Sequence, residues 1–284
     1  KYYTEDMPDG RVKHIVQNIT DPDIVPYIPD GIGNSTDRQR IPAVLIIPGG
    51  AFRRLVYNFE GEDVAKWLNS MGIAAFVLEC RLPSDEHDNA EDVPLIDAMR
   101  AMRVIRGRAQ EFGIDEAKIG VMGFSAGGFM AALLSTAYES DVYADYKYKD
   151  EYDKLSARPD FAVCSYPVIS IDDCIEAGKR YMSEEQVLER ISDSKAKILH
   201  KYNPDKLVRP DMPPVFICET DDDRTTLSEN SVGFYMAARK AGVSAELHIF
   251  RTGGHGYGCG DDFAQTGEWK VLFTKWIKSI GIIS

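Results

Sequence analysis

The sequence predicts an α/β fold with a mostly parallel, doubly wound sheet and helices on both faces. From about residue 40 onward, apolar strand-like runs alternate with helical patterns. The runs at 43–47 and 73–78 are short and almost wholly apolar, as expected of strands that are buried on both faces. Between them, residues 62–70 have a helical pattern. Such alternation places a functional site at the carboxyl ends of the strands.

Length and composition favour a single domain over residues 1–284. A chain of 284 residues with 44% hydrophobic and 10% aromatic residues can fill one large core. Two stretches interrupt the alternation. Residues 140–154 are rich in tyrosine, which suits stacking on sugar or phenolic rings and equally suits a solvated or dimer-forming excursion. Residues 172–209 have the pattern of short helices, and we expect a small partial cap there.

Further segments complete the expected architecture. Residues 12–19 predict an edge strand that packs onto the main sheet, and residues 213–219 and 245–250 predict strands late in the chain. Residues 95–112 predict one long amphipathic helix. Its arginines form a charged face, which is normally solvated, so we assign no function to them. They are Arg100, Arg103, Arg106 and Arg108.

The most informative motif is G-x-S-x-G at Gly123, Ser125 and Gly127. It follows the apolar run 119–122 and precedes a small, apolar, helix-like run at 128–138. In this context the serine occupies a sharp, strained strand-to-helix turn that only flanking glycines tolerate. The helix N-terminus then directs unpaired N–H groups and its positive dipole end at the serine. The pattern predicts that Ser125 is a nucleophile.

A nucleophilic serine needs an imidazole to take its proton and a carboxylate to orient that imidazole. His255 lies on a glycine-rich loop directly after the predicted strand 245–250. His255 is therefore the predicted base. The remaining histidines lie in polar segments, in a helical stretch or inside that strand: His14, His87, His200 and His248.

The acid is expected in the run Asp221, Asp222 and Asp223, which follows the strand 213–219. A carboxylate there lies at the end of a late strand, as the chain order Ser, acid, His requires. The residue pattern alone leaves the choice among the three open. The other use of three aspartates is a metal site, but neither EF-hand spacing nor a His or Cys pair accompanies them. We therefore expect no metal and no cofactor.

Two backbone N–H groups are expected to bind a developing oxyanion beside Ser125. Ala126, which follows the serine, supplies the first. The run 43–47 leads into the glycine-containing loop 48–52, in which Ala51 supplies the second. A simple βα turn is the alternative interpretation of this loop.

The chain is acidic, with a net charge of -12. Nucleic-acid binding draws on an excess of Lys and Arg, so the charge favours a small-molecule or oligosaccharide substrate without charge. Apolar runs such as 72–78 are far shorter than the about 20 residues of a membrane span, so we expect a soluble protein without a membrane partner. A homo-oligomer and either a cytoplasmic or an exported location stay open.

Five cysteines, without metal-ligand or disulfide-framework spacing, are expected to be mostly buried and reduced. They are Cys80, Cys164, Cys174, Cys218 and Cys259.

The chain resembles the α/β-hydrolase superfamily, and within it bacterial acetyl xylan and feruloyl esterases that act on plant cell-wall polysaccharides. The resemblance runs almost end to end. It implies a serine esterase in which Asp222 orients His255, with Asp223 as the second choice. It is carried by PGGAF (48–52), the segments 59–83, 97–128 and 158–170, PPVFICETDDD (213–223) and GGHGYG (253–258).

The chain departs from its relatives in the loop after residue 47. Relatives commonly carry a third glycine where this chain has Ala51, which retains the backbone N–H donor. Arg53 and Arg54 are a further departure, which could alter what the acyl pocket accepts.

The resemblance implies ester hydrolysis through an acyl-enzyme, with short acyl groups, acetyl above all, as the best substrates. The enzyme alternatives are a general short-chain carboxylesterase and a serine peptidase of the prolyl-oligopeptidase type. Such peptidases usually add a propeller for which this chain is too short. A non-catalytic binding protein with this fold would be expected to lack the Ser, the acid or the His.

Overall fold

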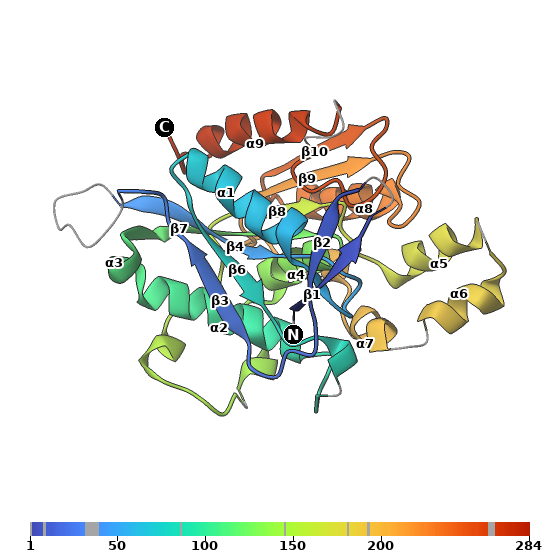
Figure 1. Cartoon of the computed structure of the whole chain (residues 1–284), viewed down its shortest axis with the longest axis horizontal. Helices are drawn as coiled ribbons and strands as arrows, with labels where there is room; N and C mark the ends of the chain where they lie inside the picture. Colours follow the sequence, from blue (N-terminus) through green and yellow to red (C-terminus); the bar gives the residue numbers. More distant parts are fainter. Residues whose placement is uncertain are drawn as a thin grey trace.

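The computed structural model describes the chain except for residues 1, 8–9, 32–39, 86, 145, 181, 192–193 and 261–264. Its centre is a twisted sheet with helices packed on both faces (Figure 1). Neighbouring strands are parallel except for β3, which pairs antiparallel with β6 at one edge. The predicted fold class is confirmed. In spatial order the strands are β10 (Ala245–Phe250), β9 (Val215–Thr220), β8 (Ala162–Ser165), β7 (Ile114–Phe124), β4 (Ile41–Ile47), β6 (Ala74–Glu79) and β3 (Asp23–Tyr27).

Two hydrophobic clusters form the core, one on each face of the sheet. Alternate residues of β4 belong to different clusters, with Leu45 in one and Val44 in the other, because successive side chains of a strand point to opposite faces. The first cluster includes residues of α2 (Val93–Gly107), α4 (Ala126–Ala137) and α8 (Ser228–Lys240). The second includes residues of α1 (Asp63–Ser70) and α9 (Glu268–Ser279).

The N-terminal segment forms a sheet of its own, and here the expectation of an edge strand on the main sheet is wrong. β2 (Val12–Val16) is the middle strand of an antiparallel sheet, between β1 (Tyr2–Asp6) and β5 (Leu55–Val56). β5 belongs to the chain that follows β4, so this small sheet lies close to the loop at Gly49 and Gly50. The turn η1 (Asn58–Glu62) then leads into α1.

The helix predicted over residues 95–112 is divided in the structure. α2 ends at Gly107, and the short α3 (Ala109–Phe112) follows after Arg108, whose φ of −99° and ψ of 17° depart from helical values. Gly113, with a φ of 68°, then closes α3 in the left-handed conformation that glycine adopts without strain. A short turn, η2 (Pro83–Asp85), precedes α2.

Arg100 and Arg103 of α2 bind the tyrosine-rich stretch and Arg106 binds the chain just after it, so the expectation of a solvated face is wrong for these three; Arg108 pairs with exposed Glu111. Arg100 forms an ion pair with Asp150 at 2.5 Å, and the guanidinium of Arg103 lies 4.1 Å from the ring centroid of Tyr143. Arg106 donates to the backbone carbonyl of Arg158 at 3.0 Å. These contacts hold the turns η3 (Asp141–Tyr143) and η4 (Glu151–Lys154) against α2.

The second interruption forms three helices: α5 (Ile171–Lys179), α6 (Glu184–Ile191) and α7 (Ser194–Lys201). The turn η5 (Pro204–Lys206) follows them. α5 and α6, in yellow, project from the body of the molecule in Figure 1, whereas α7 lies against it. Within the described part of the chain, no helix has the length and apolar character needed to cross a bilayer.

Candidate active site

The motif at Gly123, Ser125 and Gly127 forms the sharp turn that the sequence predicts. β7 ends at Phe124 and α4 begins at Ala126, so Ser125 alone connects strand to helix, with a φ of 54° and a ψ of −118°. A Cβ atom on Gly123 would lie 1.9 Å from the carbonyl oxygen of Gly127, and one on Gly127 would lie 1.9 Å from that of Ile47. Both glycines are therefore required by close backbone approach.

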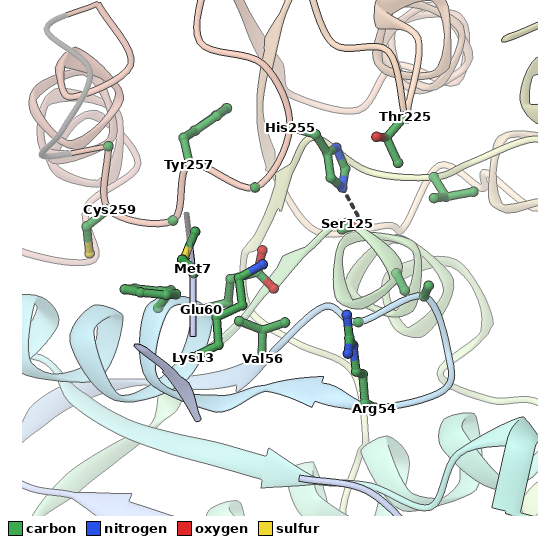
Figure 2. Close-up of a pocket in the computed structure, with 18 of the residues that line it drawn as sticks. Met7, Lys13, Arg54, Val56, Glu60, Ser125, Thr225, His255, Tyr257 and Cys259 are labelled. Atoms are coloured by element: carbon green, nitrogen blue, oxygen red, sulfur yellow. Dashed lines mark hydrogen bonds between the residues drawn. The ribbon is translucent and has the colours of Figure 1, made fainter. Parts of the chain in front are cut away.

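His255 contacts Ser125 directly. The Nε2 atom of His255 lies 2.9 Å from the Oγ atom of Ser125 (Figure 2). The histidine belongs to the loop after β10, as expected, and its ring packs edge-on against the ring of Tyr166, with centroids 5.0 Å apart. The arrangement allows the imidazole to take the hydroxyl proton.

The carboxylate that contacts His255 belongs to Asp223, and the expectation that it belongs to Asp222 is wrong. The Oδ2 atom of Asp223 lies 2.6 Å from the Nδ1 atom of His255. Asp223 is buried, whereas Asp221 and Asp222 are exposed. Since adjacent residues of the turn after β9 point in different directions, only one of the three can reach the imidazole.

Asp222 holds the backbone of the histidine loop instead. Its Oδ1 atom accepts hydrogen bonds from the N–H groups of Gly253 and Gly254, at 2.9 and 2.8 Å. Gly254 has a φ of 64°, a conformation for which glycine is suited. The two neighbouring aspartates thus bind consecutive parts of one loop, Asp222 the backbone and Asp223 the imidazole.

Thr226 belongs to the same cluster and was missed from the sequence. Its hydroxyl donates to the Oδ2 atom of Asp223 at 3.0 Å and lies 3.3 Å from the Nδ1 atom of His255. The N–H groups of Thr225 and Thr226 donate to the Oδ1 atom of Asp223, at 2.7 and 2.9 Å. This pattern is an Asx turn, which uses backbone N–H groups and is open to each of the three aspartates, so the sequence alone does not distinguish Asp223 from Asp222.

Asp223 and the interacting carboxyl group of Glu219 have pKa values shifted in opposite directions. Burial acts to raise the pKa of Asp223, but the hydrogen bond and positive charge of His255, with the N–H groups of the Asx turn, hold it below its usual value. Burial, and after it the negative charge of Asp223, raise the pKa of Glu219 well above its usual value. The contacts of Asp223 therefore favour its ionised form, which can stabilise an imidazolium.

The loop after β4 lies beside Ser125. Ala51 and Ala126, the two residues expected to supply oxyanion donors, both line the same cavity as Ser125. Ala51 and Phe52 have φ values of 58° and 60°, so the loop turns sharply where relatives are expected to carry a third glycine. At Gly50 a Cβ atom would lie 2.0 Å from the carbonyl oxygen of Arg54, which explains the glycine there.

A buried carboxylate, also missed from the sequence, connects this loop with the histidine loop. The Oε2 atom of Glu60 accepts a hydrogen bond from the N–H group of Gly49 at 2.7 Å, and its Oε1 atom accepts one from the hydroxyl of Tyr166 at 2.8 Å. The same hydroxyl accepts a hydrogen bond from the N–H group of Gly258 at 3.1 Å. Burial raises the pKa of Glu60, whereas the hydrogen bonds from Tyr166 and Gly49 and the positive charge of His255 act to lower it.

The cavity in front of Ser125 has a volume of about 1020 Å³. Gly178, Met182 and Val187, from the segment 172–209, contribute to its wall. None of the described residues of the tyrosine-rich stretch is among those that line it. The helical segment 172–209 therefore reaches the site, whereas the described residues of the tyrosine-rich segment 140–154 do not line it.

The remaining residue types with metal or redox chemistry show no competing site among the described residues. No three His, Cys, Asp or Glu side chains there converge on a point that could hold a metal ion. Four cysteines of the described part are buried and are not joined by a disulfide: Cys80, Cys164, Cys218 and Cys259. The side chain of Cys174 lies outside the described part.

The fold and the geometry at Ser125 define a member of the α/β-hydrolase class. The model of the BD-FAE family matches residues 32–237, and the chain belongs to that family. A solved structure described as an acetyl ester-xyloside bifunctional hydrolase from Caldicellulosiruptor lactoaceticus is 35% identical. That comparison covers 95% of this chain and 97% of the other, with a TM-score of 0.75. The carboxylesterase Cest-2923 of Lactobacillus plantarum, at 20% identity and a TM-score of 0.74, supports the fold; this comparison covers 100% of this chain and 99% of the other.

Two curated relatives are longer proteins. An acetylxylan esterase of Xylanibacter ruminicola is 31% identical over 240 residues, which are 84% of this chain and 45% of that protein. The endo-1,4-beta-xylanase B of Butyrivibrio fibrisolvens is 29% identical over 269 residues, which are 92% of this chain and 40% of that protein. The chain thus spans less than half the length of the curated relatives it matches.

Proposed function

We propose that the chain is a serine esterase that removes short acyl groups, acetyl above all, from xylan-derived saccharides. The single observation that carries the proposal is the continuous hydrogen-bonded series from Ser125 through His255 to Asp223, with distances of 2.9 and 2.6 Å. The relatives with acetylxylan and acetyl ester-xyloside activity in their names support the substrate class.

In the first half of the reaction, the Oγ atom of Ser125 attacks the ester carbonyl while the Nε2 atom of His255 takes the hydroxyl proton. Asp223 keeps the Nδ1–H tautomer of the imidazole and stabilises the imidazolium that forms. The N–H groups of Ala51 and Ala126 bind the oxyanion. The imidazolium then gives its proton to the saccharide oxygen, which leaves as an alcohol.

In the second half, water attacks the acyl-Ser125 ester. His255 takes a proton from the water and returns one to the Oγ atom of Ser125, which releases the carboxylic acid. The strained backbone of Ser125 keeps its hydroxyl at the base of the cavity throughout. The segment 172–209 forms a partial cap on the domain, and its contribution to the cavity wall at Gly178, Met182 and Val187 supports this role.

The test is hydrolysis of p-nitrophenyl esters of increasing chain length, of acetylated xylo-oligosaccharides, of feruloylated sugars and of a proline-containing peptide. We expect the acetyl esters to be cleaved fastest and an organophosphonate to label Ser125, as peptide mapping would show. A best rate on the peptide would favour the peptidase alternative. Absence of cleavage and of labelling would favour a binding protein.

A further inference from the structure

The cavity differs in charge from the rest of this acidic chain. The whole sequence has 45 Asp and Glu against 33 Lys and Arg. Among the described residues that line the cavity, cations outnumber acidic side chains, and one of the two acids, Glu60, is buried beneath the surface. The cations are Arg11, Lys13, Arg54, Lys66, Arg224 and Lys270, and the acids are Glu60 and Asp63.

Lys13 is the cation placed most directly for a ligand. It lies on β2, partly buried, and its side chain makes no hydrogen bond or ion pair with any described residue. In the view of Figure 2 its side chain ends beside the carboxyl group of Glu60, on the side of the site that faces Ser125. Asn58 holds the backbone on both sides of Lys13, because its side chain bonds the N–H group of His14 and the carbonyl of Val12, at 2.9 and 2.8 Å.

Glu60 does not satisfy this ammonium group by direct contact. Its two oxygens accept hydrogen bonds from Gly49 and Tyr166, and among the described residues it forms no ion pair with Lys13. The positive charge of Lys13 favours the ionised form of Glu60, but it does so less than the hydrogen bonds from Tyr166 and Gly49 and the charge of His255. The Lys13 ammonium group lines the cavity without an ion pair to a described residue, so an anion that reaches it gains a charge-assisted hydrogen bond.

Two other cations of the rim have partners that an anion can replace. Arg54 pairs with Glu5, and both side chains are more than a third exposed. Lys66 pairs with Glu62 at 2.6 Å, with the lysine 62% exposed. Exposed pairs of this kind contribute little stability, so exchange of Glu5 or Glu62 for a ligand carboxylate costs little.

We propose that the cavity selects esters whose saccharide part carries a carboxylate, as in a uronic acid substituent, and that Lys13 and Arg54 bind that carboxylate. The proposal rests on the function proposed above. An acetyl group occupies a small part of a cavity of about 1020 Å³, so the remaining volume takes the alcohol part of the ester. Phe59 and Trp67 also line this volume, where aromatic faces suit sugar rings.

The experiment compares two acetylated xylo-oligosaccharides of equal length, one neutral and one with a single glucuronic acid. At about 20 mM NaCl we expect kcat/KM to be about tenfold higher for the acidic one, mainly through KM. At about 500 mM NaCl the preference is expected to shrink to about twofold, because salt screens charges on a partly exposed rim. Equal rates at low salt, or a preference for the neutral substrate, would overturn the proposal.

A pair of variants locates the effect. Lys13→Gln is expected to reduce the ratio of the two kcat/KM values at low salt to about twofold, whereas Lys240→Gln, at the end of α8 and outside the cavity, keeps the parent ratio. An unchanged ratio in Lys13→Gln would contradict the assignment to Lys13. Arg54→Gln provides the same measurement if Lys13→Gln does not fold.

Failure of this proposal is distinguishable from failure of the function on which it rests. A parent enzyme that hydrolyses p-nitrophenyl acetate without any preference for the acidic saccharide retains the esterase function and loses only the carboxylate site. A faster reaction on the half-ester of a dicarboxylic acid than on any acetylated saccharide would instead place the anion on the acyl side and overturn the proposal as stated.

Discussion

The turn at Ser125 and the turn after β9 both bring a side chain to His255, but they depend on different parts of the molecule. Ser125 occupies its position because Gly123 and Gly127, two residues away on either side, permit the close backbone approach. Asp223 occupies its position because burial and the Asx turn with Thr225 and Thr226 select it from three adjacent aspartates. A local motif predicted the first correctly, whereas a family resemblance assigned the second to the wrong neighbour.

The largest effect is expected at the serine. Ser125→Ala removes the nucleophile and should lower kcat on p-nitrophenyl acetate by about 10⁶-fold, with an unchanged circular dichroism spectrum. Gly281→Ala, in a left-handed turn near the C-terminus, is the control that separates loss of the nucleophile from a general loss of fold stability. More than a few per cent of the parent activity in Ser125→Ala would contradict a serine mechanism.

The next largest effect is expected in the turn after β9, where two substitutions distinguish Asp223 from Asp222. Asp223→Asn should lower kcat by about 10³- to 10⁴-fold, since the amide neither stabilises the imidazolium nor selects its tautomer. Asp222→Asn retains an oxygen that can accept from Gly253 and Gly254, and its kcat should stay within about tenfold of the parent. The reverse order of the two variants would restore Asp222 as the acid.

Substitution of Thr226 tests whether its side-chain hydroxyl contributes to catalysis in addition to the backbone N–H groups of the Asx turn. Thr226→Val keeps the shape of the side chain but removes the hydroxyl that donates to Asp223, so kcat should fall by about tenfold. Thr225→Val is the matched control, because Thr225 binds Asp223 through its N–H group. Comparable losses of kcat in both variants would show that the hydroxyl of Thr226 has no special role.

The smallest effect concerns stability and involves Glu219. Since burial raises the pKa of Glu219 in the folded protein, the folded state retains a proton that the unfolded chain loses at about pH 4.3. The contribution of Glu219 to stability is therefore full below that pH and is lost as the pH rises toward the raised pKa. Glu219→Gln cannot ionise, so its free energy of unfolding should decline less than that of the parent between about pH 5 and pH 8. Urea unfolding at several pH values measures the difference, and parallel curves would contradict it.

The charge of the cavity also differs from what the composition of the chain suggested. The net charge of -12 favoured an uncharged substrate. The folded chain gathers Arg11, Lys13 and Arg54 at the cavity from the segments around β2 and β5, which pair only in the small N-terminal sheet. Composition does not specify where charges lie, because position depends on which segments the fold brings together.

The sequence by itself determined the class of fold, the strained turn at Ser125 and the choice of His255. Each depends on local order: apolar runs of strand length, glycines at fixed spacing, and a histidine directly after a strand. The tertiary structure decided which aspartate reaches the imidazole, that Glu60 and Tyr166 connect two loops, and that Arg100 and Arg103 bind the tyrosine-rich stretch. These features depend on burial and on contacts between residues far apart in the chain, which no local pattern contains.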